Sequence, residues 1–442
     1  MVRHFNSFSG GHLGRIVDLL VHHFLGLRRT SGIAPRLAQA PLNNSEKPKL
    51  MTPSTRVPFD LSQKRLALCF TQGVSLCAWT NTGLFDREVD LYNRLCEHLE
   101  GVDFLTYGDS TDKTYSDRLH DKIQVYANRN RILKKASRRW QRVLYLQHRY
   151  VLRDSDVIKT NQIAAAPLAL FAKTAFGKKV ITRCGYLWTY MAEKENRSAE
   201  HVSRVYDLER RAFREADLGV VTTSEIRDMI IDRHQVEADK LRVIPNFVNT
   251  DIFKPLPKVE KEPGLICFVG KFEHQKNLLA LLDAVSIANR SKPPYSIRLC
   301  LIGEGSLEAE LRRKVKELDL IAEFHPRLPN YQLPKILNRA EAFVLVSNFE
   351  GHPKTSLEAM ACELPLIGTN VTGIKEEVTH EKTGFLCDTS PESIAQGIQI
   401  VMSNPALREQ LGRAARANVV AEYSLDRIVE LELDVYESVL RK

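Results

Sequence analysis

The stretch EAFVLVSNFEGHPKTSLEAMACELPLIGT, residues 341–369, contains a complete strand, helix and strand unit. The apolar runs EAFVLVS (341–347) and LPLIGT (364–369) predict buried strands, and TSLEAMAC between them predicts a helix that begins near Thr355. Two buried strands joined through a helix are typical of parallel pairing. The stretch therefore predicts a parallel α/β sheet, with the loop after Ser347 at the carboxyl end of a strand.

Apolar runs and amphipathic segments alternate in the same way along most of the chain. In the first half we expect strands at 65–73, 102–108, 155–161, 179–184, 218–223 and 240–246, and helices at 86–99, 165–176, 200–216 and 224–236. In the second half we expect strands at 265–270, 296–303, 321–326, 341–347, 364–369 and 383–387, and helices from Asn277 and over 306–318. This alternation predicts α/β architecture, with two doubly wound parallel sheets and helices on both faces of each.

The segment FVNTDIFKPLPKVEKEPG interrupts the alternation with three prolines and mixed charge, a composition typical of a linker. In doubly wound sheets, ligands bind at the carboxyl ends of the strands, so we expect a site in a cleft between two domains. The predicted boundaries are an extension at 1–60, a first domain at 61–247, a linker at 248–264, a second domain at 265–420, and a C-terminal helix at 421–442 that packs back on the first domain.

The composition is that of a globular protein, with 442 residues of which 43% are apolar. No run approaches the roughly 18 to 20 apolar residues that cross a bilayer, so any membrane contact is expected to be peripheral. The eight cysteines stand singly in or beside apolar runs, with no CxxC pair and no Cys/His cluster at metal-binding spacing. We predict buried reduced thiols, a cytoplasmic protein, and no bound metal or other cofactor.

Basic residues are concentrated in the first half of the chain. Residues 1–250 hold 39 Lys and Arg against 27 Asp and Glu, whereas residues 251–442 hold 24 against 27. The segment 127–153 has nine Lys and Arg, no acid, and apolar residues at largely helical spacing. This pattern fits a helix on an anionic membrane surface, and it also fits a solvated helix with one face packed on its own domain.

The extension at 1–60 is treated apart from the fold. It carries several arginines, few acids and the apolar patch IVDLLVHHFLGL, features that resemble a weak transit peptide or an amphipathic anchor. A disordered extension explains these features as well, because Met51 offers an alternative start before the first expected strand.

Three loops of the second half follow predicted strands and carry groups suited to an anion. In the first of them, VGKFEHQKNL (269–278), Gly270 lets the backbone approach a ligand, and Lys271 and Lys276 project from one turn. Two ammonium groups near one pocket repel each other unless an anion joins them, and phosphate is a common guest. Two solvated loop lysines would give the same sequence.

The second loop, NVTGIKEEV (370–378), offers backbone groups. Gly373 and Ile374 open a short predicted helix, so their free amides face whatever lies above the sheet. Amides at a helix N-terminus bind phosphate without a side chain. An ordinary capped helix would also show this pattern.

The third loop holds two carboxylates, Glu350 and Glu358. Thr355 and Glu358 also fit a capping box, in which the two residues satisfy each other's backbone amides at the start of a helix. A capping box explains Glu358 but not Glu350. Because all three loops follow strands of one predicted sheet, they are expected along one rim that faces the cleft.

Four ordered motifs carry a resemblance to a known family. GKFEHQKN, LIGEGSLEAEL, SNFEGHPKTSLEAMACELPL and VTGIKEEVTHEKTGFLC resemble the second domain of retaining GT-B glycosyltransferases of family 4, whose signature is E-x7-E. Glu350 and Glu358 fit that signature. The resemblance is strong over residues 245–390 and weak over 64–244.

The resemblance implies a nucleotide-diphosphate sugar in the cleft. It places Lys271 and Lys276 on the diphosphate, Glu358 on the ribose hydroxyls and Glu350 at the donor sugar. The family more often has arginine at the first lysine position, and glycine where this chain has Glu363. Further donor-binding positions implied by the resemblance are Gly270, Gly351, His352, Pro353, Lys354, Thr355, Gly373 and Ile374, with Arg327 and Leu328 at the base.

The implied mechanism depends on charge. Cleavage of the sugar C1–O bond creates an oxocarbenium-like centre while negative charge grows on the departing diphosphate, so cations and helix amides lower the barrier. The cations replace a divalent metal, so no DxD motif is required; the chain has DSD at 154–156, in the other domain. By resemblance the anomeric configuration is retained, and neither glutamate is assigned as a covalent nucleophile.

The first domain is expected to face the acceptor. SLCAWTNTGLFDREVDLYNRL turns through Gly83 and resembles the loop that closes over the diphosphate, although the usual double glycine is missing. The segments KTNQ (159–162), with Asn161, and TRCGYLW (182–188), with Arg183 and Tyr186, end strands and would line the cleft. Many family members carry histidine where this chain has RCGY, and a surface ion pair explains Arg183 as well.

The sequence thus predicts a hexosyltransferase with a nucleotide-sugar donor and a growing glycan or lipid-linked acceptor at the inner face of a membrane. A non-catalytic binder of anionic lipid or nucleic acid through residues 127–153 is the alternative of a different class, and a GT-B epimerase or phosphorylase is another. The motif spacing of the second domain favours the transferase, and no nucleic-acid partner is expected.

Overall fold

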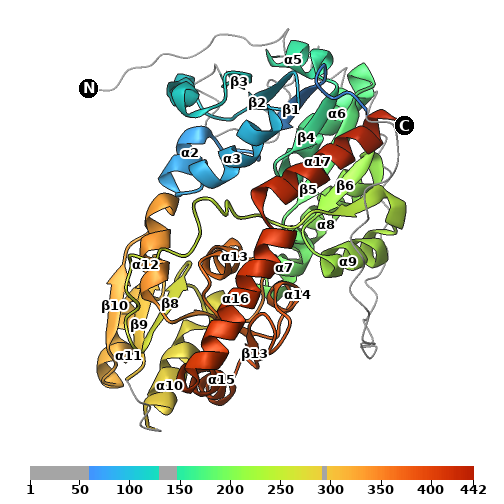
Figure 1. The fold of residues 1–442 in the computed structure, drawn as a ribbon. Helices are drawn as coiled ribbons and strands as arrows, with labels where there is room; N and C mark the ends of the chain where they lie inside the picture. The colour runs from blue at the N-terminus through green and yellow to red at the C-terminus, as the bar shows by residue number, and fades with distance from the viewer. Residues whose placement is uncertain (1–58, 129–146, 291–295) are drawn as a thin grey trace, which may run out of the picture. The chain divides into compact units, whose positions relative to one another are not determined.

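The computed structural model describes residues 59–128, 147–290 and 296–442, which belong to one unit that begins at Phe59. Its strands form two sheets in which every pairing is parallel, and helices pack on both sheets (Figure 1). The strand orders are β3-β2-β1-β4-β5-β6-β7 and β10-β9-β8-β11-β12-β13. In each sheet the first three strands are added in one direction, and the next strand pairs on the other side of the first one, β1 or β8. This change of direction is typical of doubly wound sheets.

The strands are short and mostly buried, because helices cover both faces of a parallel sheet. The first sheet contains β1 (Arg65–Cys69), β2 (Gly101–Leu105), β3 (Ile123–Tyr126), β4 (Val157–Thr160), β5 (Lys179–Cys184), β6 (Leu218–Val221) and β7 (Leu241–Val243). The second contains β8 (Leu265–Val269), β9 (Arg298–Ile302), β10 (Ala322–His325), β11 (Ala342–Leu345), β12 (Leu366–Thr369) and β13 (Phe385–Cys387).

The helices follow the strands in alternation. Those of the first half are α2 (Leu76–Asn81), α3 (Phe85–Leu95), α5 (Arg149–Asp154), α6 (Ala166–Phe176), α7 (Trp188–Lys194), α8 (Ala199–Glu215) and α9 (Ser224–His234). Those of the second half are α10 (Leu278–Arg290), α11 (Glu308–Glu317), α12 (Leu333–Arg339), α13 (Lys354–Ala361), α14 (Ile374–Glu377), α15 (Pro391–Ser403), α16 (Pro405–Glu422) and α17 (Leu425–Leu440).

The strand β3 was not predicted from the sequence. It has only four residues, IQVY, lies at the edge of the first sheet and is partly exposed, so it lacks the continuous apolar run of a buried strand. The helices α2, α7, α12, α15 and α16 were not predicted either. The first three have only six or seven residues, too few turns for a clear helical period, whereas α15 and α16 are long and follow the last predicted strand.

The chain passes between the two sheets twice. It runs from β7 to β8 through residues 244–264, and it returns through the segment between α16 and α17. The two passages pair: the Val248 amide donates to the Tyr423 carbonyl, and the Leu425 amide donates to the Val248 carbonyl, both at 3.0 Å. Apolar residues of α17 lie in the same core as strands of the first sheet.

The capping-box hypothesis for the loop after β11 was wrong. Helix α13 begins at Lys354, and its N-cap is Pro353, which makes no side-chain capping bond. Thr355 is therefore already inside the first turn, and Glu358 lies too deep in the helix to reach back to an N-cap amide. The Glu358 side chain is free to serve another purpose.

Substituting Glu363 with glycine is expected to raise the melting temperature. Glu363 follows α13 with a φ of 61°, in the left-handed region that costs an L-residue about 1 kcal/mol but suits glycine. The net gain should be about 0.5 kcal/mol, because glycine also loosens the unfolded chain. Thermal unfolding measures it.

Glu409→Gly, within α16, is the matched control for that substitution, and it should lower the melting temperature because glycine weakens a helix interior. A lower melting temperature for Glu363→Gly would mean that the contact between Arg416 Nε and Glu363 Oε1, at 4.0 Å, outweighs the backbone strain.

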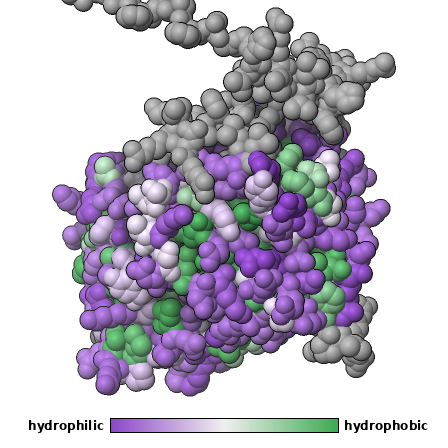
Figure 2. All heavy atoms as spheres, turned by 90° about the horizontal axis from the view of Figure 1, so that it is seen from above, coloured by the Kyte–Doolittle hydropathy of each residue, from purple (hydrophilic) through white to green (hydrophobic). Residues whose placement is uncertain are grey.

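Two expectations lie mostly outside the described residues: the extension at 1–60, of which 1–58 are not described, and the basic segment 127–153, of which 129–146 are not described. In the described part of the chain, no helix combines the length and the apolar composition that crossing a bilayer requires. On the face drawn in Figure 2, the described residues are mostly hydrophilic, with hydrophobic ones in small separate groups. All eight cysteines are described; they are free, and all but Cys77 are buried.

Candidate active site

Glu358 lies on α13 with 1% of its surface exposed. Arg87 of α3 donates from Nη1 to Glu358 Oε1 at 3.1 Å, and Asn330 donates from Nδ2 to the same oxygen at 2.9 Å. Within the described residues, the other oxygen, Glu358 Oε2, is buried and has no hydrogen-bond partner. Arg87 Nε is also buried without a partner there. Each is a group that a bound ligand could satisfy.

Glu350 lies in the loop after β11 and is also buried. Lys276, at the end of the short 3-10 helix His274–Lys276, donates from Nζ to Glu350 Oε1 at 2.5 Å. The Ser347 hydroxyl donates to the same oxygen at 2.5 Å. Lys276 comes from the loop after β8, so the carboxyl ends of two neighbouring strands supply the pair.

Lys354, the first residue of α13, pairs with Glu88 of α3, with Nζ and Oε1 2.5 Å apart. Burial opposes ionisation of both groups. It lowers the pKa of Lys354 to about 8, while for Glu88 the neighbouring Lys354, Arg183 and Arg87 outweigh burial and lower the pKa to about 2. The pair therefore holds two largely buried charges, on side chains 13% and 21% exposed, that stabilise each other.

His352 is held on both sides. Its carbonyl accepts a hydrogen bond from Asn246 Nδ2 at 2.6 Å, and Arg183 Nη2 donates to Asn246 Oδ1 at 2.9 Å. Its Nδ1 lies 3.1 Å from Glu377 Oε1 of α14. Burial lowers the pKa of His352 to about 3, so the histidine is neutral near pH 7, and burial raises the pKa of Glu377 well above its usual range.

Glycines let the loops approach one another closely. A side chain at Gly351 would collide with the Gly185 carbonyl and the Tyr186 Cβ, 2.8 and 2.9 Å from the added carbon. Gly373, with a φ of 85°, packs against the Gly351 carbonyl in the same way. The 370–378 loop, the Glu350 loop and the end of β5 therefore meet at one point.

Gly83 brings the first sheet to the predicted base position. It has a φ of 63° and stands between α2 and α3. A Cβ added there would lie 3.6 Å from Arg327 Cδ and 3.7 Å from the Leu328 carbonyl oxygen. These three predicted residues, distant in the sequence, are thus neighbours.

Several predicted residues serve the scaffold or stand apart. Lys271 is exposed, and the Thr355 side chain is only partly buried. The side chain of Ile374 lies in the core, which leaves its backbone as the group available to a ligand, and Gly270 sits against the ring of Phe268. Asn161 accepts at Oδ1 from the Thr71 hydroxyl at 3.4 Å.

Two expectations for the first domain need correction. Lys159, at the start of the KTNQ segment, does not line a cleft: it is fully buried and pairs with Glu432 of α17. Arg183 does not make the surface ion pair that was considered, because it is half-buried and its guanidinium donates to the side-chain amide oxygen of Asn246.

Sequence reasoning missed Arg87, Glu88, Asn246, Asn330 and Glu377. Arg87 and Glu88 stand in the helix that follows Gly83, and their pairing with α13 joins residues more than 260 positions apart. The glycine turn marked this helix as one near the site, but nothing in its sequence singled out Arg87 and Glu88 among its several charged residues. Asn246 sits in a loop and Asn330 opens a three-residue 3-10 helix, and single asparagines are common at such places and carry no pattern.

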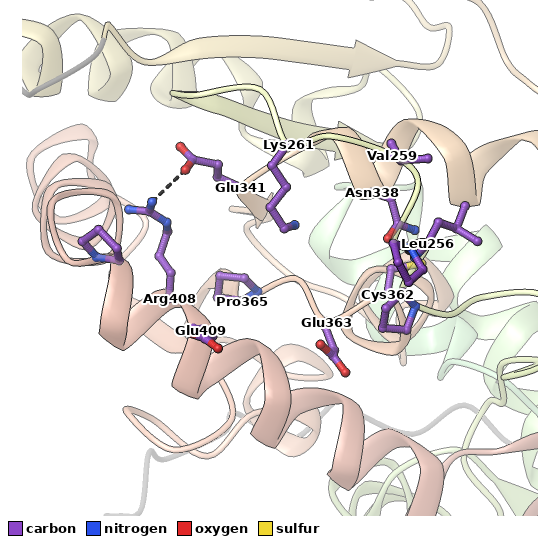
Figure 3. Close-up of a pocket in the computed structure, with 13 residues that line it drawn as sticks. Leu256, Val259, Lys261, Asn338, Glu341, Cys362, Glu363, Pro365, Arg408 and Glu409 are labelled. Atoms are coloured by element: carbon purple, nitrogen blue, oxygen red, sulfur yellow. Dashed lines mark hydrogen bonds and ion pairs between the residues drawn. The ribbon is translucent and has the colours of Figure 1, made fainter.

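A cavity of about 340 Å³ lies beside the linker (Figure 3). The ion pair between Arg408 Nη2 and Glu341 Oε1, 2.7 Å apart, lies at its wall, and burial lowers the pKa of Lys261 inside it. None of the candidate donor-binding residues lines this cavity. It is therefore a separate feature from the cluster around Glu350 and Glu358.

Two protein-family models match the chain, one over each half. The model described as Glycosyl transferases group 1 matches residues 249–418, and the model described as Glycosyltransferase Family 4 matches residues 89–252. Together they cover both sheets except β1.

Curated relatives match at low identity. The α-maltose-1-phosphate synthase of Mycolicibacterium smegmatis is 26% identical over 257 residues, which are 52% of this chain and 66% of the relative. The D-inositol 3-phosphate glycosyltransferase of Pseudarthrobacter chlorophenolicus is 26% identical over 209 residues, or 44% of this chain and 50% of the relative. The matched part of the chain thus spans between half and just under two-thirds of these relatives.

Solved structures share the whole architecture. Sucrose-phosphate synthase from Thermosynechococcus elongatus has a TM-score of 0.70 at 19% identity, covering 86% of this chain and 100% of that chain. Anabaena Alr3699/HepE in complex with UDP and glucose has a TM-score of 0.68 at 16% identity, covering 85% and 100%. The family matches and this shared architecture show that the chain belongs to the group 1, family 4 glycosyltransferases and has the GT-B fold of two Rossmann-like domains.

Proposed function

We propose that the protein transfers a sugar from a nucleotide-diphosphate sugar to an acceptor, with retention of the anomeric configuration. The observation that carries this proposal is the buried Oε2 of Glu358, which has no partner among the described residues. A buried acceptor without a donor costs about 1–3 kcal/mol, more when it is charged. The adjacent hydroxyls of a ribose would supply the missing donor, as the family resemblance implies for this position.

The surrounding cations support the transfer step. Lys276 contacts Glu350, and Arg87 contacts Glu358 while its buried Nε has no partner among the residues that the structure describes, so positive charge lies beside both carboxylates. When the sugar C1–O bond breaks, its electron pair goes to the departing diphosphate, whose growing charge these cations would stabilise. We therefore propose that the transfer needs no divalent metal.

The acceptor is proposed to approach over Tyr186. Tyr186 is 40% exposed and stacks on Trp188, with ring centroids 6.1 Å apart. It also lies against Gly351, in the loop that carries Glu350. The acceptor hydroxyl would attack C1 from the face that the diphosphate leaves. We propose a growing glycan or a lipid-linked sugar as acceptor, at the inner face of a membrane that the basic segment contacts.

The substitution Glu358→Gln tests the donor site. It should weaken nucleotide binding about 10- to 100-fold, because hydrogen bonds to a charged group contribute about 1.5–3 kcal/mol. UDP is the first probe, because the structurally similar Alr3699/HepE is solved in complex with UDP and glucose. Other nucleoside diphosphates complete the panel. Calorimetry measures the binding, and slow hydrolysis of nucleotide sugars measures turnover.

The control is Glu381→Gln, which changes an exposed glutamate of the same domain and should leave nucleotide affinity unaltered. The melting temperature of each variant shows whether lost binding follows from lost folding. Unaltered affinity in Glu358→Gln would mean that Glu358 serves only as the partner of Arg87. If no nucleoside diphosphate binds the unmodified protein, the transferase proposal fails.

A further inference from the structure

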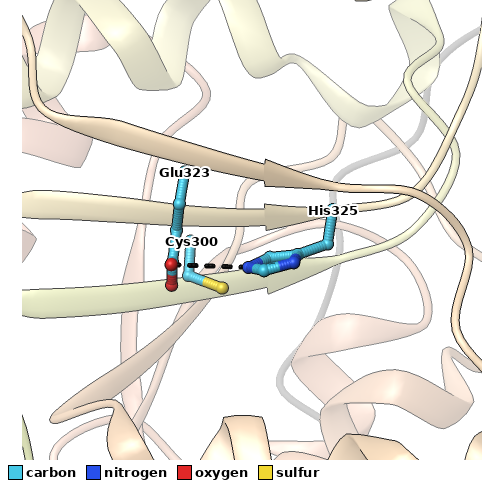
Figure 4. A group of neighbouring side chains, drawn as sticks. All are labelled: Cys300, Glu323 and His325. Atoms are coloured by element: carbon cyan, nitrogen blue, oxygen red, sulfur yellow. Dashed lines mark ion pairs between the residues drawn. The ribbon is translucent and has the colours of Figure 1, made fainter.

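A sulfur, a nitrogen and a carboxylate come together at the edge of the second sheet, away from the candidate active site. Cys300 lies on β9, and Glu323 and His325 lie on the edge strand β10. One potential metal-ligand atom from each side chain lies within 4.8 Å of the others. Figure 4 shows the three side chains converging, with His325 directed back toward the other two.

Strand register explains why these residues meet. Glu323 stands opposite Cys300 in the parallel pairing of β10 with β9, so their side chains share one face of the sheet. His325 follows Glu323 by two residues and returns to the same face. Cys267 stands opposite Cys300 on the neighbouring strand β8, so a second sulfur lies next to the first in the sheet.

The surroundings orient these groups. Arg339 donates from Nη2 to Glu323 Oε1 at 3.2 Å, which fixes the carboxylate, while His325 Nε2 lies 3.4 Å from Glu323 Oε2. That contact is too long for a good hydrogen bond, and Nε2 is buried without a hydrogen-bond partner in the described residues. An imidazole nitrogen that lies beside a carboxylate and a thiol, with only a long contact to the carboxylate, is placed for a shared ligand.

We propose that Cys300, Glu323 and His325 bind a divalent, thiol-preferring metal ion of the zinc type. Zinc takes this mixture of sulfur, nitrogen and oxygen ligands, whose atoms lie about 3.5 Å apart in a tetrahedral site. Small side-chain rotations of the two edge residues bring the present spacing to that value. The thiolate formed on binding and the Glu323 carboxylate together balance the charge of the ion, and Arg339 acts as the outer partner that holds the carboxylate.

Binding would fasten the edge strand to the sheet. Among the described strands, β10 pairs only with β9, and His325 is its last residue. Residues 326–332 follow directly and carry Asn330, the partner of Glu358. An ion at this position links β10 and β9 through side chains as well as through the backbone, so the site is structural and supplies no step of sugar transfer.

Metal binding to the full chain tests the proposal. The protein is freed of metal with a chelator, and Zn²⁺ or Co²⁺ is titrated into the unmodified chain and into His325→Ala, Cys300→Ser and Cys387→Ser. The unmodified protein should bind one equivalent more than His325→Ala, and its Co²⁺ complex should show a thiolate charge-transfer band. Zn²⁺ should raise its melting temperature and should not raise that of His325→Ala.

The controls separate this site from other ligands in the chain. Histidines of residues 1–58 remain in every variant, so only the difference in stoichiometry reports on the proposed site. Cys387→Ser removes a buried thiol at the opposite edge of the sheet and should keep the band. Cys300 is buried, so Cys300→Ser can lose metal binding through misfolding. The comparison of metal stoichiometry between the unmodified chain and His325→Ala, a change at the sheet edge, therefore decides whether the site exists. Equal stoichiometry in the unmodified chain and in His325→Ala would overturn the proposal.

Discussion

Replacing Lys276 with alanine is expected to lower turnover about 100- to 1000-fold, the cost of removing one preorganised group from a developing negative charge. Lys276 Nζ is 2.5 Å from Glu350 Oε1, on a side chain that is 17% exposed. If the proposed function is right, this ammonium group meets the diphosphate as its charge grows. Binding of intact donor should fall much less than turnover, because the interaction strengthens toward the transition state.

Separate kcat and KM values for donor hydrolysis distinguish this role from a structural one. A lysine that only neutralises Glu350 would change the melting temperature and KM, and its replacement by arginine would restore both. If the lysine instead stabilises the departing diphosphate, its removal lowers kcat. Arginine would then restore kcat only in part, because the guanidinium is larger and differently shaped. Lys382→Ala, an exposed change in the same domain, is the control. An unchanged kcat in Lys276→Ala removes this residue from the mechanism.

Alternation of apolar runs predicted most of the fold. A buried parallel strand must be apolar on both faces, so strands such as β11 stand out in the sequence as short continuous runs. The same reasoning fails for β3, whose outer position removes the need for an apolar run. It also placed the start of α13 one residue late, because proline at the N-cap supplied the break without a capping side chain.

The candidate site was predictable only where it is local. Glu350 and Glu358 were found because they lie close together in the sequence, in one loop and the helix that follows it, and their spacing fits the E-x7-E signature. Arg87 was not found, because its contact with Glu358 depends on how the two sheets meet, and a helix with many charged residues gives no sign of which one turns inward.

The buried ion pair between the halves of the chain has the largest expected effect on stability. Lys159 of β4 is fully buried and donates from Nζ to Glu432 Oε2 at 2.5 Å, with the Tyr436 hydroxyl 3.4 Å away. Burial lowers the pKa of Lys159, since the charged form loses its water. Glu432 comes from α17, the helix that returns from the second sheet, so the pair fixes that helix to the first sheet.

Glu432→Ala should destabilise the protein by about 3–5 kcal/mol, because it leaves the ammonium group of Lys159 buried without a counter-charge. The double substitution Lys159→Met with Glu432→Leu should recover most of this loss, since matched apolar side chains need no partner. The shift of the urea unfolding midpoint measures both, and Glu430→Ala, exposed on the same helix, should change stability by less than about 0.5 kcal/mol. If Glu432→Ala unfolds at the same urea concentration as Glu430→Ala, water must reach Lys159, and α17 would be held by its apolar face alone.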